Sequence, residues 1–473
     1  MDRSPIYSAI KTYVQENYLR CHMPGHIGGQ GMVSELKAAA SLDVTEVPGL
    51  DDWHLPRQAI LEACQLLSQA YNASNSMFLV NGATSGIQAL FLSLPAHASV
   101  LLPRNAHRSF YGGMVLSGAR PVYIPPLMVE ELGIAITVMP DAISRSLEDN
   151  AEVEAVFMVS PSYYGTTCDL AAIAEITRRE DKLLYIDEAH GGHFPFHPEY
   201  PPAAMGCGAD GAVNGLHKTL PVLNQGAVLH GGPRAPWDKI EAAASLITTT
   251  SPSYPILASL DLARELMVAE GQKILEQSLL LSRRYKKRIN TIKGLNCLNE
   301  ELLSLPGVTG IDPLKVLISL DGWGLDGYKL ADILRSDYNI QVELAEERII
   351  LAMMSIFHEA EDWERLYQAL KALAGKYPVT TAVKPIELPP WPEVILSPRQ
   401  AYFAPRRRVT FNECRGHLAG EMVAVYPPGI PCLLPGEKIN EEVFAYLQYI
   451  KGSNSRLQGP ADPQLKYIDI VDS

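Results

Sequence analysis

Two short apolar runs in the middle of the chain end in residues whose side chains could do chemistry. The run Leu183–Ile186 is followed by Asp187, and the run Gly211–Val213 leads into His217 and Lys218. Open α/β sheets place their ligand contacts at the carboxyl ends of parallel strands. We therefore predict that the aspartate and the lysine belong to one site.

An aspartate at the end of one strand and a lysine after the end of a second strand favour pyridoxal phosphate chemistry. Lys218 would bind the cofactor aldehyde as a Schiff base, and Asp187 would keep the pyridine nitrogen protonated so that the ring accepts electrons. The alternative is that both are ordinary turn residues, because aspartate and solvated lysine are common after strands. These two positions alone do not decide between the interpretations.

A phosphate-binding turn is predicted further upstream. The strand Met77–Val80 runs into Asn81–Gly86, and Ile87–Leu94 continues as a helix. Small and hydroxyl residues at such a turn expose backbone N–H groups at the positive end of a helix. The segment matches neither the dinucleotide glycine motif nor a P-loop, so we expect it to hold a single phosphate monoester.

Several histidines lie near these segments. His107, at a helix start after the strand Val100–Pro103, is either a ring that lies flat on an aromatic cofactor or a surface residue. His190 follows the strand-end acid closely, so we take it as a neighbour of the site. His193 and His197 are expected to be structural, because the glycine and proline residues around them hold no regular metal geometry.

Five acids could line a pocket for a positively charged substrate. A buried cationic group requires such acids or carbonyls nearby. Near a helix start, however, the same acids are also favoured by the helix dipole as solvated turn residues, and the sequence leaves both possibilities open. They are Asp43, Glu46, Asp51 and Asp52, before the helix Gln58–Tyr71, and Glu343, after the strand Ile340–Val342.

The composition is that of a globular protein with an acidic surface. The 473 residues are 47% hydrophobic, with 40 Lys+Arg against 53 Asp+Glu and a net charge of −13. Without a dense basic run, no nucleic-acid partner is expected. The seven cysteines include no Cys-x-x-Cys pair, which predicts reduced thiols in a cytoplasmic protein. No apolar stretch is long enough for a membrane helix, so no membrane partner is expected.

The alternation of strands and helices predicts the α/β class, with a mostly parallel sheet covered on both faces. A long helical pattern from 256 to 292 marks a change of domain. A proline-rich stretch marks a second boundary, as a stiff linker. The expected parts are an N-terminal arm (1–30), a large cofactor-binding domain (31–270), a small α/β domain (271–376), a linker (377–394) and a C-terminal domain (395–473).

Taken together, these stretches resemble the bacterial ornithine/lysine/arginine decarboxylase family, which has the fold-type I, aspartate-aminotransferase-like pyridoxal phosphate fold. The resemblance is to the short, biosynthetic form, without the long N-terminal domain of the acid-stress members. Several blocks in one order carry it, whereas each alone is weak. The blocks are 22–26, 43–54, 81–86, 104–109, 187–197, 217–218, 249–254 and 426–437.

The resemblance implies a role for each matched residue. Lys218 would bind the cofactor covalently, and Asp187 would pair with its ring nitrogen. His107 and Ala189 would lie on the two faces of the ring, beside His190. The active site would lie between two subunits, with residues 249–253 reaching it from the neighbour, in a homodimer or a dimer of dimers. The phosphate would be held by Ala83, Thr84, Ser85 and His217.

The resemblance also implies decarboxylation of a basic amino acid, with Lys218 or His217 returning a proton to Cα. We expect arginine to give agmatine for polyamine biosynthesis, because clustered acids suit a planar guanidinium; lysine and ornithine follow. An aminotransferase, a lyase or a non-catalytic paralogue are the alternatives. Gly215, Gly226 and Ala227 stand where relatives commonly carry hydroxyls, and each lost bond to a charged phosphate costs about 1.5–3 kcal/mol.

Overall fold

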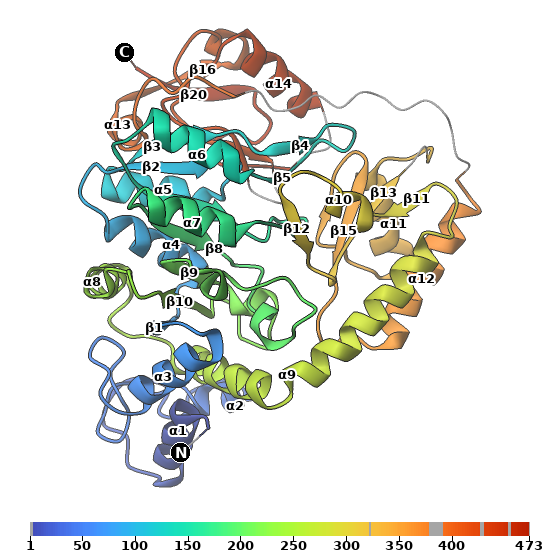
Figure 1. Cartoon of the computed structure of the whole chain (residues 1–473). Helices are drawn as coiled ribbons and strands as arrows, with labels where there is room; N and C mark the ends of the chain where they lie inside the picture. The colour runs from blue at the N-terminus through green and yellow to red at the C-terminus, as the bar shows by residue number, and fades with distance from the viewer. Residues whose placement is uncertain (1–2, 321–322, 378–390, 426–429, 453–455, 473) are drawn as a thin grey trace. The chain divides into compact units, whose positions relative to one another are not determined.

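A computed structural model describes residues 3–320, 323–377, 391–425, 430–452 and 456–472 (Figure 1). The chain divides into two compact units. The first unit comprises Met1–Ser93 and Leu183–Leu275, and the second comprises Leu94–Lys182 and Glu276–Ser473. The later boundary falls inside the long helix α9 (Tyr254–Ile289). The predicted domain boundaries at 30, 270, 376 and 394 stay predictions, and most of the proline-rich linker lies outside the described residues.

The strands of the first unit bring the two candidate strand ends side by side. β8 (Leu183–Asp187) and β9 (Gly211–Asn214) are parallel, with Asp187 opposite Val213. β10 (Ala227–Gly231) pairs antiparallel with β9, and β1 (Asn75–Leu79) pairs antiparallel with β10. The predicted apolar runs are thus confirmed as strands. The connection between β9 and β10, which the structure describes throughout, contains a 3-10 turn at Leu216–Lys218 and no α-helix.

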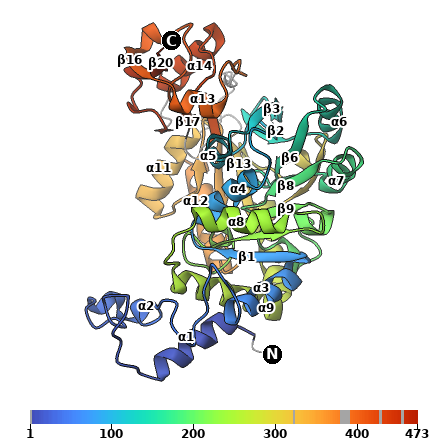
Figure 2. The ribbon, with the colours of Figure 1, turned by 90° about the vertical axis from the view of Figure 1, so that its left-hand side faces the viewer.

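Helices surround these strands in the first unit. α4 contacts both β9 and β10 and packs against α8, and α3 packs against β1 (Figure 2). The predicted helix Gln58–Tyr71 is confirmed as α3, which begins one residue later. The helices are α1 (Pro5–Gln15), α2 (Lys37–Ser41), α3 (Ala59–Tyr71), α4 (Gly82–Leu92) and α8 (Trp237–Ile247), and the 3-10 turns are η1 (Ser34–Leu36), η2 (Phe194–Phe196), η3 (Ala204–Cys207) and η4 (Leu216–Lys218).

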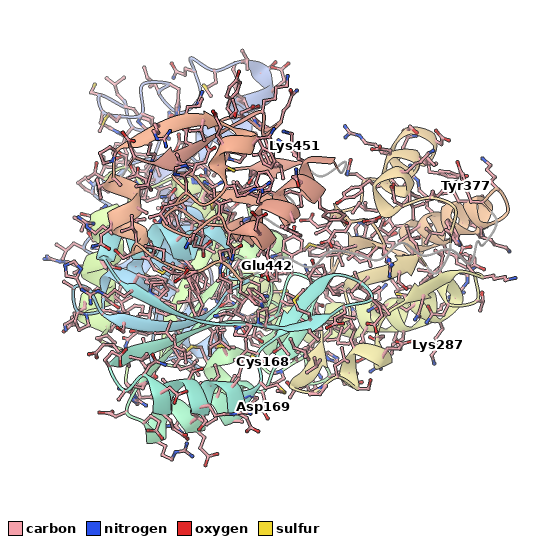
Figure 3. All side chains as sticks on the ribbon, turned by 90° about the horizontal axis from the view of Figure 1, so that it is seen from above. Cys168, Asp169, Lys287, Tyr377, Glu442 and Lys451 are labelled. Carbon is pink, nitrogen blue, oxygen red and sulfur yellow. The ribbon has the colours of Figure 1, made fainter. Side chains whose placement is uncertain are left out.

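The second unit begins with the predicted βαβ alternation. β2 (Ser99–Pro103) lies between β3 (Arg120–Ile124) and β6 (Val153–Val159), and both pairs are parallel. Asp169, labelled in Figure 3, accepts a hydrogen bond from Ala172 N at 3.0 Å and so caps the helix it was predicted to start. The connecting helices are α5 (Arg108–Ser117), α6 (Pro140–Asp149) and α7 (Leu170–Arg179).

A smaller antiparallel sheet follows in the second unit, in the order β11-β13-β15-β14. The predicted strand Ile340–Val342 is wrong, since β14 contains only Leu344 and Ala345. Two further antiparallel pairs were not predicted: β4 and β5, which are joined by a short turn, and β7 and β12, which are far apart in the sequence. The bounds are β4 (Leu127–Val129), β5 (Ile134–Thr137), β7 (Thr166–Cys168), β11 (Leu295–Cys297), β12 (Val308–Ile311), β13 (Lys315–Leu320), β14 (Leu344–Ala345) and β15 (Ile349–Met353), with helices α10 (Glu300–Leu303), α11 (Gly327–Tyr338) and α12 (Ala360–Ala374).

The C-terminal part of the second unit has a hydrophobic core of its own. Phe411 stacks on Phe444 with ring centroids 5.0 Å apart, and Cys414, Leu433 and Leu447 are fully buried around them. The elements are α13 (Pro398–Phe403), β16 (Arg406–Thr410), η5 (Phe411–Cys414), β17 (Val423–Val425), β18 (Ile430–Leu433), α14 (Glu441–Gly452), β19 (Leu457–Gln458) and β20 (Tyr467–Val471). None of the described helices is long and apolar enough to cross a bilayer.

Candidate functional site

The predicted acid and lysine lie at neighbouring strand ends in the first unit. Asp187 is the last residue of β8, and Lys218 ends the 3-10 turn η4, which follows β9. The Asp187 side chain is buried, with Oδ1 accepting a hydrogen bond from Ala189 N at 3.1 Å. Its Oδ2 has no hydrogen-bond partner in the described part of the chain, so this oxygen is available to a ligand.

The charges at these strand ends interact. Burial raises the pKa of the Asp187 carboxyl above its usual range, while the positive charge of Lys218 and the Ala189 N–H oppose that rise. Lys218 Nζ lies 3.2 Å from His190 Nε2. The structure thus brings His190 to the site, as expected from its position after the acid. A second positive charge beside Asp187 would favour its ionised form further.

His217 is oriented by the backbone of the neighbouring strand segment. Its Nδ1 lies 2.9 Å from Gly226 O, and because a carbonyl only accepts hydrogen bonds, Nδ1 carries the proton. Burial, and to a smaller extent the charge of Lys218, lowers the pKa of the imidazole. The neutral ring then carries a lone pair on Nε2, which suits it to accept a proton better than to donate one to a phosphate.

The predicted phosphate turn forms the first turn of α4. Gly82 N donates to Gln225 O at 2.8 Å, and Ser85 Oγ donates to Gly82 O at 2.8 Å. No side chain caps this helix, whose N-cap residue is Asn81. The backbone N–H groups of Ala83 and Thr84 therefore lie in an uncapped first turn, where an anion is favoured.

Local packing accounts for two of the missing hydroxyls. A Cβ at Gly226 would lie 2.2 Å from Val222 Cγ1 and 3.1 Å from Leu223 O, so a side chain there would require its neighbours to shift. A Cβ at Gly215 would lie 3.1 Å from Ala189 O and 3.3 Å from Lys218 Cδ. Serine or threonine at these positions would thus require rearrangement next to the lysine.

Two predicted site residues belong to the second unit. His107 is the N-cap of α5, and its Nδ1 accepts a hydrogen bond from Ser109 N at 3.2 Å. Glu343 accepts a hydrogen bond from the Tyr163 hydroxyl. The stacking role of His107 and the substrate-binding role of Glu343 stay predictions.

The acids of the loop before α3 have local partners. The Asp51 carboxylate accepts hydrogen bonds from the backbone N–H groups of Arg57, Gln58 and Ile60 at 2.7–3.1 Å, so it caps α3. This capping disfavours a direct contact of Asp51 with a substrate, because both oxygens are engaged.

The remaining acids of this loop are less constrained than Asp51. Asp43 Oδ2 lies 3.1 Å from His26 Nε2, Glu46 accepts from the Thr45 hydroxyl, and Asp52 Oδ1 accepts from His54 N at 2.8 Å. All three side chains are partly exposed. Their role in substrate binding stays a prediction.

The other histidines after β8 pack with aromatic rings. His193 is fully buried, with its ring edge-on to Phe194 at 4.8 Å and to Tyr200 at 5.2 Å, and His197 lies edge-on to Tyr200 at 5.6 Å. Within the residues that the structure describes, no group of three or more His, Cys, Asp or Glu side chains could hold a metal ion.

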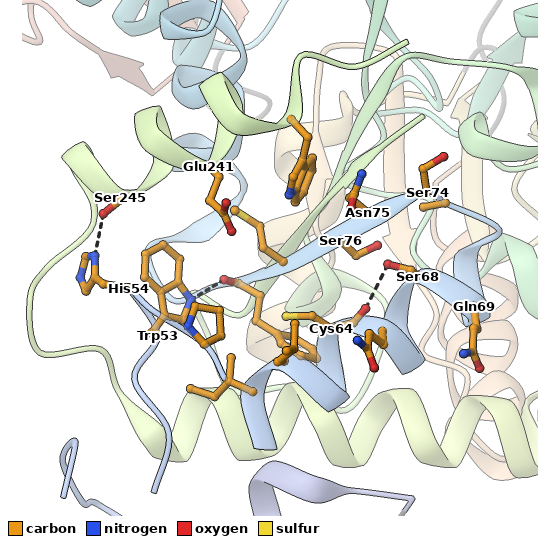
Figure 4. A pocket seen from close by; sticks show the side chains of 18 of the residues that line it. Trp53, His54, Cys64, Ser68, Gln69, Ser74, Asn75, Ser76, Glu241 and Ser245 are labelled. Carbon is orange, nitrogen blue, oxygen red and sulfur yellow. Dashed lines mark hydrogen bonds between the residues drawn. The ribbon is translucent and has the colours of Figure 1, made fainter. Parts of the chain in front are cut away.

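A cavity of about 570 Å³ lies elsewhere in the first unit and is lined by none of the residues proposed for the cofactor (Figure 4). It lies between the 53–56 loop, α3, β1 and α8. Trp53 Nε1 donates to Phe78 O at 2.8 Å, and His54 Nδ1 lies 2.7 Å from Ser245 Oγ. His54 Nε2 lies 3.0 Å from Thr249 O, so this loop is tied to the segment that was predicted to reach a neighbouring subunit. No sequence signal indicated this contact.

Comparison with known protein families gives two matches that together span most of the chain. Residues 4–362 match the family model described as Orn/Lys/Arg decarboxylase, major domain, and residues 387–461 match Orn/Lys/Arg decarboxylase, C-terminal domain. The arginine decarboxylase of Bacillus subtilis is 33% identical over 99% of this chain and 98% of its own length. The arginine decarboxylase of Bacillus anthracis is 31% identical over 99% of this chain and 97% of its own length.

Solved structures show the same fold. The lysine decarboxylase of Francisella novicida superimposes with a TM-score of 0.84 at 19% identity, covering 99% of this chain and 81% of that one. The constitutive lysine decarboxylase of E. coli gives 0.82 at 19% identity, covering 99% and 82%. These matches confirm the predicted fold class, and the sequence matches confirm the predicted family. The chain belongs to the Orn/Lys/Arg decarboxylase family.

Proposed function

We propose that this protein is a pyridoxal-phosphate-dependent decarboxylase that converts arginine to agmatine. The observation that carries the proposal is the buried carboxylate of Asp187 beside the amine of Lys218, at adjacent parallel strand ends. The match to arginine decarboxylases over nearly the full length of both chains supports the choice of reaction and substrate.

The residues of the first unit fit this cofactor. Lys218 would hold its aldehyde carbon, and Asp187 would accept a hydrogen bond from its ring nitrogen through the unengaged Oδ2. The uncapped first turn of α4, with Ala83, Thr84 and Ser85, would hold its phosphate. When bound, the cofactor supplies an electron sink for the bond that breaks at the substrate Cα.

The chain's own groups would manage protons and charge during the reaction. Asp187 favours a protonated ring nitrogen, because a carboxylate stabilises a neighbouring cation. His217 keeps Nδ1–H on Gly226 O, which leaves Nε2 free to take or return a proton near Cα. Lys218 Nζ, bonded to His190, is the second candidate for that proton.

The substrate preference is inferred from charge and shape. Arginine, lysine and ornithine share a positive distal group, but only arginine presents a planar guanidinium that binds two carboxylate oxygens at once. Asp43, Glu46, Asp52 and Glu343 are the proposed acids of the pocket, and Asp51 would support the loop by capping α3. The proposed ranking is arginine, then lysine, then ornithine.

A homodimer in the cytoplasm is the proposed working form. In it, residues 249–253 of one subunit would reach the site of the other, as the family resemblance implies. The structure supports a fixed conformation of this segment, because His54 contacts Thr249 O and the Tyr254 hydroxyl donates to Asp51 O. A dimer of dimers is the proposed alternative assembly.

The decisive experiment measures carbon dioxide and amine release from arginine, lysine and ornithine. Purified protein is saturated with pyridoxal phosphate, and the specificity constants for all three substrates are compared. Arginine is expected to give the largest value. A larger value for lysine or ornithine would reject the ranking, and release of no amine from any of them would reject decarboxylation. A keto acid formed instead of an amine would indicate an aminotransferase.

A further inference from the structure

Glu188 directly follows Asp187, and the proposed function leaves it without a role. Its side chain is only 1% exposed. Its backbone N–H donates to Val213 O at 3.0 Å, which extends the contact between β8 and β9 past the end of β8. A buried carboxyl group is strongly unfavourable unless it is hydrogen-bonded, so its partners indicate why it is there.

Each carboxyl oxygen of Glu188 accepts one hydrogen bond. Ala204 N donates to Oε1 at 2.8 Å, and Asn214 Nδ2 donates to Oε2 at 3.0 Å. The same Nδ2 lies 3.1 Å from the Glu188 backbone oxygen. Asn214 is fully buried and is the last residue of β9, and Ala204 begins η3. The side chain thus connects three segments of the first unit.

This connection spans the two strand ends that carry the proposed cofactor residues. Asn214 leads through Gly215 into η4, where Lys218 N donates to Gly215 O at 2.8 Å. Gly215 N in turn donates to Ala189 O at 3.1 Å, on the β8 side. If Asn214 moved away from Glu188, the turn that carries the lysine would move relative to the strand-end aspartate.

The loop after β8 fits closely around this carboxyl group. A Cβ at Gly191 would lie 2.6 Å from Glu188 Cγ, and a Cβ at Gly192 would lie 2.6 Å from Leu216 Cδ2 in η4. Only glycine therefore allows the loop to approach both the glutamate and the lysine-bearing turn. Removal of the Glu188 side chain would leave a void beside both strand ends.

We propose that Glu188 is a positioning residue for Asp187 and Lys218. Its carboxyl group, bonded to Asn214 and Ala204, fixes the separation of the two cofactor-binding groups without touching the cofactor. The inference rests on the proposed function, because it takes the aspartate and the lysine as the residues that hold pyridoxal phosphate. It adds a residue that the site requires for its geometry.

The other end of the same strands offers a matched control. Asp210 is also buried, at 4% exposure, and its Oδ2 accepts a hydrogen bond from Leu184 N at 2.8 Å. Asp210 directly precedes β9, so this hydrogen bond also links β9 to β8, but at the ends of the strands that are remote from Lys218. A general loss of packing between the strands should affect both acids, whereas positioning should affect only Glu188.

The test compares full-length wild type, Glu188→Ala, Glu188→Gln and Asp210→Ala. For each, the melting midpoint without cofactor, the dissociation constant for pyridoxal phosphate, kcat and KM are measured. Both alanine variants should melt earlier. Glu188→Ala should bind the cofactor at least about ten-fold more weakly, and Asp210→Ala should stay within about three-fold of wild type. Glu188→Gln keeps an acceptor for Ala204 N, and if the Asn214 amide turns, its Oδ1, which has no hydrogen-bond partner among the described residues, accepts from the glutamine NH2 group. This variant should therefore restore most of the affinity.

Equal losses of affinity in the two alanine variants, or no rescue by glutamine, would overturn the proposal. If Glu188→Ala does not fold, Asn214→Ala removes the donor alone and must weaken cofactor binding; unchanged affinity would overturn the proposal as well. Wild type that binds the cofactor at Lys218 but releases no carbon dioxide rejects the proposed function and leaves the affinity comparison valid. Wild type that binds no cofactor rejects both.

Discussion

Lys218 Nζ and His190 Nε2 lie 3.2 Å apart, although 28 residues separate them in the chain. The contact forms because β8 and β9 are parallel neighbours whose carboxyl ends meet at one edge. The ammonium group donates, so His190 Nε2 accepts and carries no proton. The lysine therefore has an acceptor nitrogen beside it and also interacts electrostatically with the Asp187 carboxyl group.

The first prediction concerns the attachment of the cofactor. Borohydride reduction of the loaded protein should fix the cofactor to the peptide that contains Lys218, and Lys218→Ala should abolish turnover with an unchanged melting midpoint of the apoprotein. Peptide mapping by mass spectrometry checks the first result. Label on another lysine would show that the assignment is wrong. Lys239→Ala, an exposed lysine of α8, serves as the control and should keep full activity.

The second prediction concerns Asp187. Asp187→Asn removes the charge that stabilises a protonated ring nitrogen and keeps the shape of the side chain. We expect kcat to fall far more than KM rises. A rate that stays within a factor of about ten of wild type, roughly 1.4 kcal/mol in activation free energy, would contradict the role. The ultraviolet-visible spectrum of the bound cofactor should also change, which a purely structural effect would not produce.

Much of the site could be predicted because its signals are local. The apolar runs before Asp187 and Lys218 predicted buried strands. In an α/β protein the carboxyl ends of parallel strands meet at one edge of the sheet. A helix after the strand Met77–Val80 was also predicted, but its start was placed at Ile87, whereas α4 begins at Gly82. These inferences needed only residue type and order along the chain.

What the sequence could not show are partners that depend on distant segments. The acid Asp51 reads equally well as a substrate ligand or a helix cap, and only its distances to the N–H groups of α3 distinguish them. Glu188 lies in the block 187–197 without a predicted role, and its bond to Asn214 forms only because β8 and β9 are adjacent. Helix α8 (Trp237–Ile247) was not predicted, although its alanines favour a helix and its buried residues Ile240, Ala243 and Ala244 have helical spacing.

The third prediction concerns the segment held by His54. His54→Ala removes the ring whose Nε2 lies 3.0 Å from Thr249 O and whose Nδ1 lies 2.7 Å from Ser245 Oγ. Limited proteolysis should then cut faster within residues 249–253, and kcat/KM should fall if this segment serves a neighbouring site. Ser68→Ala, in the same cavity but bonded within its own helix to Cys64 O, should change neither. Equal cleavage rates in wild type and His54→Ala would refute the anchoring role.

The fourth prediction concerns pH and Glu188. Burial raises the pKa of its carboxyl to about 8, while the bonds from Asn214 and Ala204 N partly oppose this. In the unfolded chain the group titrates near 4.5, so between these values the folded protein holds a proton that the unfolded chain has lost. Its contribution to the free energy of unfolding is therefore fully present below about pH 4.5 and declines up to pH 8, by up to about 1.4 kcal/mol per pH unit.

Glu188→Gln cannot titrate, so it isolates this contribution. Urea unfolding of the apoprotein at pH 5, 6, 7 and 8 should show that the stability of wild type relative to Glu188→Gln decreases as the pH rises. A difference that stays constant across this range would contradict the raised pKa. Ionic strength is held fixed in all buffers, so that surface charges contribute equally to both proteins.

The last prediction concerns the buried ion pair of Arg104 and Glu437 in the second unit. The pair is 2.8 Å long, and its side chains are only 5% and 2% exposed. Arg104 Nη1 also donates to Pro431 O at 2.7 Å, and Leu434 N donates to Glu437 Oε2 at 2.7 Å, so the arginine ties the end of β2 to the C-terminal core. Arg104→Met would leave an unpaired buried carboxyl and should destabilise the protein by about 3–5 kcal/mol. Because burial already raises the pKa of Glu437 and Arg104 opposes the rise, the loss of stability should be larger at pH 8 than at pH 5.

Two further variants serve as controls. The double variant Arg104→Met/Glu437→Leu should recover most of the stability, and Arg415→Met, which breaks the exposed pair with Glu441, should have far less effect. Urea unfolding at both pH values checks these outcomes, and a pH-independent loss in Arg104→Met would show that packing, rather than the uncompensated charge, accounts for the effect.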